Sequence, residues 1–138
     1  MSETPAIDGN ALCQEYFGAV QDLMQRVLTE EAKALDEAAD ILADEIAADR
    51  LIHVFGPGGH SNLATQEVFF RAGGLMHIDA ILDEGTMLAN GALRSMAIER
   101  TPGYGRVVIA NRGLGAPDVL VLVNAYGINA ALIDSALE

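Results

Sequence analysis

Three apolar, β-rich runs, each followed by a loop and then by a segment with helical spacing, constrain the fold of this chain more than any other feature. The runs cover residues 51–55, 75–82 and 119–123. The last of them, VLVLV, is apolar throughout, which is typical of a strand buried on both faces. A strand, a loop and a helix repeated three times predict a parallel, doubly wound α/β sheet with right-handed crossovers.

The stretch over residues 51–70, LIHVFGPGGHSNLATQEVFF, holds the strongest local signal for a ligand site. Its strand ends in a sharp Gly-Pro-Gly-Gly turn, and His60, Ser61 and Asn62 can open and cap the following helix. Backbone N–H groups in such a turn can approach an anion at the positive end of a helix dipole. The pattern matches neither the dinucleotide fingerprint nor the Walker loop, so a purely structural turn remains the alternative.

Helical spacing elsewhere predicts two N-terminal helices, a helix from Ser61 to a glycine stop at Gly73, a helix over residues 87–99 and a last helix after residue 129. Thr29 is predicted to cap the second helix, which runs to about Asp49. Residues 106–111, RVVIAN, fit a strand and a helix equally well. We expect a flexible lead-in over residues 1–10 and one domain over 11–138, with helices over 11–49 and the sheet and ligand loops over 51–138.

Composition and charge argue against several classes of partner. Eight Lys and Arg residues against 20 Asp and Glu residues give a formal charge of -12, so the chain should repel nucleic acid and anionic membrane surfaces. The sequence holds no apolar run of spanning length, and its first residues do not resemble a signal peptide. Cys13 is the only cysteine, which excludes an intrachain disulfide and fits a reducing cytoplasm. Three scattered histidines predict no metal site.

Three side chains are candidates for acid–base chemistry. Glu67 lies on an otherwise apolar helical segment, where a carboxylate is costly unless it is paired or functional. An ion pair with Arg71, four residues later, is the structural alternative, and both interpretations stay open. Glu84 follows the second strand at the ligand edge of the sheet and is a second candidate, with simple solvation as its alternative. His60, inside the glycine loop, can donate to an anion or hydroxyl or shuttle a proton.

Five segments together carry a resemblance to a known family: HVFGPGGHS, EVFFRAGG, ILDEGTMLANGALRSMAIER, GYGRVVIANRG and DVLVLVN. With them, the chain from about Tyr16 onward resembles the sugar isomerase (SIS) domain proteins, and most of all their small single-domain, phosphosugar-binding branch. The resemblance implies a three-layer αβα fold with a parallel five-stranded sheet in flavodoxin-like order, and it implies a helix over residues 106–111. It further implies homo-oligomers that bind a phosphorylated sugar. In catalytic members a glutamate moves a proton between adjacent carbons of an open-chain aldose or ketose, without a metal or organic cofactor.

Carried onto this chain, the resemblance implies a substrate site made of two loops. The expected substrate-binding residues are Gly58, Gly59, His60, Ser61, Asn124, Tyr126, Gly127 and Asn129. The candidates for proton transfer are Glu67, Glu84 and His60. In the second loop the family has a Ser-x-Ser-Gly sequence whose hydroxyls hold the phosphate, whereas this chain has NAYG and then Ile128. We therefore expect the phosphate contacts to fall mainly on the first loop.

The family also continues through further strands, whereas this sequence stops one helix after its third predicted strand. A three-stranded sheet would leave the apolar run at residues 119–123 as an unpaired edge, which is prone to aggregation. We expect a partner chain, a second copy or further sequence to cover it. Two functions therefore remain open: a phosphosugar-binding protein with isomerase activity, and a non-catalytic SIS-like subunit that assembles with a partner completing the sheet.

Overall fold

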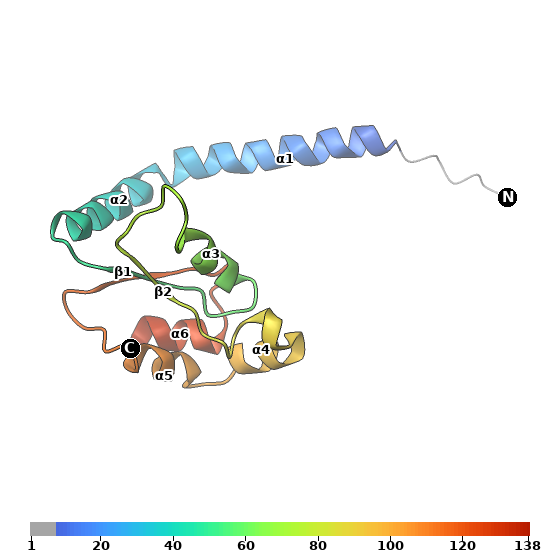
Figure 1. The fold of residues 1–138 in the computed structure, drawn as a ribbon. Coiled ribbons are helices and arrows are strands. Elements are labelled where there is room, and N and C mark those ends of the chain that lie inside the picture. The colour runs from blue at the N-terminus through green and yellow to red at the C-terminus, as the bar shows by residue number, and fades with distance from the viewer. Residues whose placement is uncertain (1–7) are drawn as a thin grey trace. The chain divides into compact units, whose positions relative to one another are not determined.

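The computed structural model describes residues 8–138 (Figure 1). The chain divides into two compact units, one ending at Ile41 and one running from Leu42 to Glu138. Residues 1–7 of the predicted lead-in lie outside the described part of the chain, and residues 9 and 10 are already helical.

The predicted N-terminal helical pair is confirmed. Helix α1 spans Gly9–Glu30 and helix α2 spans Ala32–Ala47. Asp8 caps α1, because its side chain accepts hydrogen bonds from the first-turn backbone N–H groups of Asn10 and Ala11. The cap predicted at Thr29 is wrong: its hydroxyl donates back to the carbonyl of Gln25, one turn earlier in α1, and so does not serve α2.

The predicted parallel sheet is confirmed over three strands. They are β1 (Ile52–Phe55), β2 (Ile78–Ile81) and β3 (Val119–Leu122), all parallel and arranged in the order β2-β1-β3. The first strand is therefore central, and its carboxyl end lies at the point where strand order reverses. Ligands bind at this point in open α/β sheets. Strand β2 is shorter than the predicted run over residues 75–82.

Four helices and one 3-10 turn complete the second unit. They are α3 (Ser61–Val68), η1 (Leu88–Asn90), α4 (Ala92–Glu99), α5 (Tyr104–Ala110) and α6 (Ala130–Leu137). Helix α5 decides the ambiguous segment 106–111 in favour of a helix, as the family resemblance implied.

Two helix boundaries differ from the prediction. Helix α3 ends at Val68, not at the glycines, because Phe69 is extended and Phe70 has a φ of 52°. The glycines instead form a turn closed by the Gly74 N–H and the Arg71 carbonyl. The helix predicted over residues 87–99 is interrupted at Gly91, whose φ of 112° is accessible to glycine without strain.

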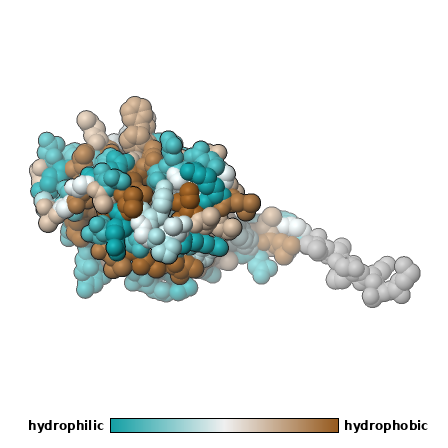
Figure 2. Space-filling view, turned by 90° about the horizontal axis from the view of Figure 1, so that it is seen from below, coloured by the Kyte–Doolittle hydropathy of each residue, from teal (hydrophilic) through white to brown (hydrophobic). Residues whose placement is uncertain are grey.

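The core lies between the sheet and α5. Phe55 of β1 and Ile81 of β2 are partners across the two strands, so their side chains lie on the same face of the sheet, where they pack against Ile109 of α5. Helices α5 and α6 cover this face, and α3 lies across the other (Figure 1). This gives the layered α/β fold that the sequence predicts. The surface on the α5 and α6 side carries hydrophobic residues among hydrophilic ones (Figure 2).

Candidate functional site

The two predicted ligand loops line one cavity of about 260 Å³ beyond the carboxyl ends of β1 and β3. Helix α4 and the 3-10 turn before it form the remaining wall. The lining residues are Gly58, Gly59, His60, Ser61, Leu88, Ala92, Ser95, Met96, Glu99, Asn124, Ala125, Tyr126 and Asn129. Seven of the eight predicted substrate-binding residues are thus brought together, and only Gly127 does not line the cavity.

The first loop is a tight backbone turn that presents N–H groups. A Cβ atom on Gly56 would lie 2.0 Å from the carbonyl oxygen of Ser61, so only glycine fits there. Within the described chain, the backbone N–H groups of Gly59, His60 and Ser61 donate to no protein acceptor. They stand at the start of α3, where the helix dipole favours negative charge. The loop is therefore suited to an anion.

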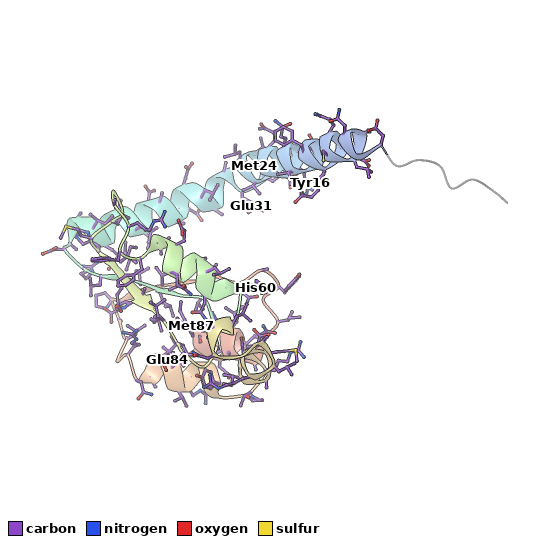
Figure 3. The ribbon with its side chains drawn as sticks, turned by 45° about the vertical axis from the view of Figure 1, so that its right-hand side comes forward. Tyr16, Met24, Glu31, His60, Glu84 and Met87 are labelled. Atoms are coloured by element: carbon purple, nitrogen blue, oxygen red, sulfur yellow. The ribbon has the colours of Figure 1, made fainter. Side chains whose placement is uncertain are left out.

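His60 occupies the N-cap position of α3 but makes no side-chain capping bond within the described residues, so the predicted capping role is wrong. Its side chain is exposed at the cavity mouth. Figure 3 shows it at the beginning of the helix. The imidazole is therefore free to meet a ligand.

The second loop is folded around Asn124. The side-chain oxygen of Asn124 accepts hydrogen bonds from the backbone N–H groups of Tyr126, at 2.9 Å, and Gly127, at 2.7 Å. The side-chain nitrogen lies 3.4 Å from the hydroxyl of Ser61 and donates to it. This one amide therefore shapes the second loop and links it to the first.

Glu99 is a cavity residue that the sequence reasoning missed. It lies at the end of α4, with one carboxylate oxygen 2.9 Å from where a Cβ on Gly58 would be. A signal was present in the sequence, because Ala92, Ser95, Met96 and Glu99 are spaced as one helical face and all four line the cavity. Which face turns toward the first loop is decided by tertiary packing alone.

The two carboxylates that the sequence suggested for proton transfer, Glu67 and Glu84, do not line this cavity. Glu67 forms an ion pair with Arg71 at 3.0 Å on the exposed side of α3, which is the structural alternative weighed above. Glu84 is exposed in the loop after β2, where Figure 3 labels it. Its backbone carbonyl accepts from the side chains of Asn90 and Arg94, which fixes the loop rather than the carboxylate.

A network of buried polar side chains holds together the segments that line the cavity. The side-chain nitrogen of Asn62 donates to the carbonyl of Gly58, at 3.3 Å, and to the hydroxyl of Thr86, at 2.9 Å. The hydroxyl of Ser95, on α4, donates to the carbonyl of Thr86 at 2.7 Å. Asn62, Thr86 and Ser95 are all buried. The glycine loop, the loop after β2 and helix α4 are therefore held together by hydrogen bonds that are shielded from water.

The network continues through Asp83 and Tyr104. The Tyr104 hydroxyl donates to the Asp83 carboxylate at 2.9 Å, and the backbone N–H of Thr86 donates to the same carboxylate at 2.9 Å. Burial, together with the hydrogen bond to Asp83, raises the pKa of Tyr104 to about 12. Tyr104 thus stays a hydrogen-bond donor at neutral pH. A Cβ on Gly85 would lie 1.9 Å from its hydroxyl oxygen, so glycine is required there.

Residues 8–138 show neither a metal site nor a membrane-spanning helix. No three His, Cys, Asp or Glu side chains in this range are placed to hold a metal ion together. No helix in it combines the length and the apolar composition that crossing a bilayer requires.

Comparison with known proteins agrees with the resemblance drawn from the sequence segments. The SIS domain model matches residues 15–138. The chain is 40% identical over 121 residues to a UPF0309 protein of Halalkalibacterium halodurans, covering 88% of this chain and 48% of that protein. UPF0309 proteins of Listeria innocua and Brucella ovis are each 37% identical over 125 residues, covering 91% of this chain and 50% and 51% of theirs. The chain thus spans about half the length of the curated relatives it matches, and it belongs to the SIS domain family.

Proposed function

We propose that this chain binds a phosphorylated sugar in the cavity between the loop at residues 56–61 and the loop at residues 124–129. The observation that carries the proposal is that both loops, 63 residues apart at Ser61 and Asn124, line one cavity at the carboxyl ends of parallel strands. This is where α/β sheets bind ligands. The SIS family to which the chain belongs supports a phosphosugar as the ligand.

In this proposal the phosphate lies at the first loop. The N–H groups of Gly59, His60 and Ser61 supply donors without protein acceptors, and the dipole of α3 adds a favourable field. His60 is placed to donate a further hydrogen bond to the phosphate or to a sugar hydroxyl. Among residues 8–138, no lysine or arginine side chain lines the cavity, so backbone donors carry most of the recognition.

We assign the proton-transfer step of an aldose–ketose isomerisation to Glu99, because it is the carboxylate that lines the cavity. A base in this reaction removes the proton from the carbon next to the carbonyl. It then returns that proton to the former carbonyl carbon of the enediol, while the proton of the adjacent hydroxyl passes to the former carbonyl oxygen. Glu67 and Glu84, which the sequence suggested for this role, lie outside the cavity lining and would have to move to reach a bound sugar.

Thermal denaturation against a panel of sugar phosphates tests the binding proposal. A ligand that binds only the folded chain at 100 times its dissociation constant stabilises it by about 2.7 kcal/mol, which raises the melting temperature by several degrees. Unphosphorylated forms of the same sugars are the control, and we expect them to give little shift. The proposal fails if no phosphorylated sugar shifts the melting temperature at millimolar concentration.

Exchange of substrate hydrogen with deuterated water tests the assignment of Glu99. Any sugar phosphate that binds and isomerises should exchange the hydrogen next to its carbonyl. Glu99→Gln should slow this exchange by about 10²- to 10⁴-fold while keeping the thermal shift. Glu67→Gln and Glu84→Gln are matched controls that should retain exchange. If one of these controls loses exchange while Glu99→Gln retains it, the base is Glu67 or Glu84 and not Glu99.

A second candidate function is assembly with another polypeptide that completes the sheet, without catalysis. The observation in its favour is an apolar hollow of about 380 Å³ on the face of the sheet opposite α5. Ile52 and Val54 of β1, together with Val121 of β3, line it, and β3 is one of the two edge strands of the described sheet. Mass measurement in solution separates the candidates, because a soluble, monodisperse monomer would count against assembly.

A further inference from the structure

The second loop already contains an acceptor where a ligand anion would be expected. The N–H groups of Tyr126 and Gly127 converge on one point, and the side-chain oxygen of Asn124 occupies it at 2.9 and 2.7 Å. Successive backbone N–H groups that converge in this way form the concave sites that bind anions in proteins. Gly127, with a φ of 67°, has the left-handed conformation that such a turn needs. A neutral amide oxygen of the chain itself therefore fills this position.

The amide nitrogen of Asn124 is held as well as its oxygen. Its amide nitrogen donates to the hydroxyl of Ser61, which opens α3 and belongs to the first loop. The two ends of one side chain thus engage both loops at once, and the residue is only partly exposed. A phosphate oxygen entering the second loop would have to displace the amide from three hydrogen bonds. The first loop offers free donors at no such cost.

We propose that Asn124 is a specificity-determining residue that closes the second loop to phosphate, so that the ligand's anionic group is held by the first loop alone. This inference rests on the proposed function and deepens it. The cavity then takes ligands with one terminal anionic group. Beside that group, the second amide N–H of Asn124 can donate to a hydroxyl of the sugar, and the carboxylate of Glu99 can accept from one.

The charges that line the cavity also favour a ligand with a single anionic group, held at the first loop. Of the charged residues in the described part of the chain, Glu99 lines the cavity and no lysine or arginine does, so a second anionic group would meet repulsion without a compensating cation. Helix α6 follows the second loop, and within that loop Asn124 accepts from the N–H groups of Tyr126 and Gly127. A bisphosphorylated sugar should therefore bind no better than a monophosphorylated one.

Removing the amide tests the inference. Asn124→Ala frees the N–H groups of Tyr126 and Gly127, and we expect it to bind inorganic phosphate and a bisphosphorylated hexose about tenfold more tightly than the unaltered chain, as one additional charge-assisted hydrogen bond would give. Asn124→Asp keeps the acceptor and adds a negative charge, so it should bind both probes more weakly. Asn111→Ala, at the exposed end of α5, is the matched control and should leave affinity unchanged.

Backbone amide resonances of the unaltered full chain give a readout that does not depend on how well a variant folds. Titration with inorganic phosphate should shift the amides of Gly59, His60 and Ser61 and leave those of Tyr126 and Gly127 in place. In Asn124→Ala both sets should shift. Movement of the Tyr126 and Gly127 amides in the unaltered chain would overturn the inference, as would equal phosphate affinity in a folded Asn124→Ala variant.

The same experiment separates this inference from the proposed function. If the unaltered chain binds no phosphate or sugar phosphate, the proposed function fails. Phosphate binding gained in Asn124→Ala, with shifts at Tyr126 and Gly127, would still support the role of Asn124. If neither the unaltered chain nor Asn124→Ala binds phosphate, the proposed function and the inference both fail. Binding at the second loop of the unaltered chain overturns only the inference.

Discussion

At the scale of single residues, Glu45 is a buried carboxylate that is neutralised by a partner close in sequence. Glu45 is 4% exposed, yet it is a carboxylate on α2. Both of its oxygens accept from the guanidinium of Arg50, the first at 2.5 Å and the second at 2.8 Å. This two-point hydrogen bond holds the pKa of Glu45 below its ordinary range. The pair ties the end of α2 to Arg50, in the short segment between α2 and β1.

The Glu45–Arg50 pair should make stability depend on pH in a defined direction. Because the pKa of Glu45 is lowered in the folded chain, its contribution is present above the ordinary glutamate value of about 4.3 and is lost as pH falls through the folded value. Glu45→Gln should therefore unfold at lower urea concentration than the unaltered chain at pH 7. The gap should close below about pH 4. A gap that is the same at pH 7 and pH 3 would contradict this assignment.

Tyr104 should lose its proton at a higher pH than an ordinary tyrosine, and its contribution to stability should depend on pH in the opposite direction to that of Glu45. Its pKa is raised to about 12 by burial and by its bond to Asp83, so its contribution to stability is present below about pH 10 and is lost as pH rises through about 12. The near-ultraviolet absorbance titration of the unaltered chain minus that of Tyr104→Phe isolates this hydroxyl. A difference curve with its midpoint near 10 would show that the bond to Asp83 does not persist in solution.

At the scale of elements, α5 and α6 approach closely because Gly105 has no side chain. A Cβ atom there would lie 1.9 Å from the carbonyl oxygen of Ala131 and 2.6 Å from the hydroxyl of Ser135. Ser135 donates that hydroxyl to the Ala131 carbonyl at 2.7 Å, so the contact region on α6 is itself fixed. The crossing seats α5 against the sheet, where Ile109 joins Phe55 in the core.

Gly105→Ala should destabilise the chain by about 2 to 3 kcal/mol, the upper part of the range for overpacking, because the added methyl group meets backbone and not a flexible side chain. Urea denaturation measures this difference directly. Gly115→Ala is a matched control, since a Cβ at Gly115 meets nothing within 4 Å. Similar midpoints for the two variants would mean that the helices separate easily and that the crossing is not a constraint.

At the scale of the whole molecule, apolar surface remains on elements that belong to either unit. None of the 22 residues of α1, all of which are described, is buried, and Tyr16 and Leu23 lie on its apolar side. Phe70 and Met76, in the second unit, are 95% and 94% exposed. Large exposed apolar patches mark interaction surfaces in soluble proteins. Both surfaces fit the assembly proposed above.

Substitution on α1 tests whether its apolar side takes part in assembly. If copies of the chain associate through α1, Leu23→Glu should place a charge in the contact and reduce the molecular mass measured by light scattering toward that of one chain. Gln25→Glu, on another side of the same helix, adds the same charge and should leave the mass unchanged. Equal masses for the two variants and the unaltered chain would exclude α1 from the interface.

Some of the fold and part of the site follow from sequence alone, because their signals are local. Alternation of side chains along a strand assigns Phe55 to one face and Val54 to the other, and the structure places them so. The three strand–loop–helix repeats require parallel strands, and parallel strands bring their carboxyl-end loops to one edge. That is why the predicted loops at Gly58 and Asn124 line one cavity.

Other features depend on contacts between segments that are distant in the chain. Residues 106–110 are helical, with Ile109 packed on the sheet, although their β-branched composition suits a strand equally well. Glu99 enters the cavity because Ser95, on the same helix, is tied to Thr86 after β2. Asn124 reaches Ser61 across 63 residues. Sequence alone determined the strands, their direction and the edge where the loops meet, since periodicity is a local property. Tertiary structure decided which carboxylate and which amide line the cavity, since burial and partner choice arise only when distant segments pack.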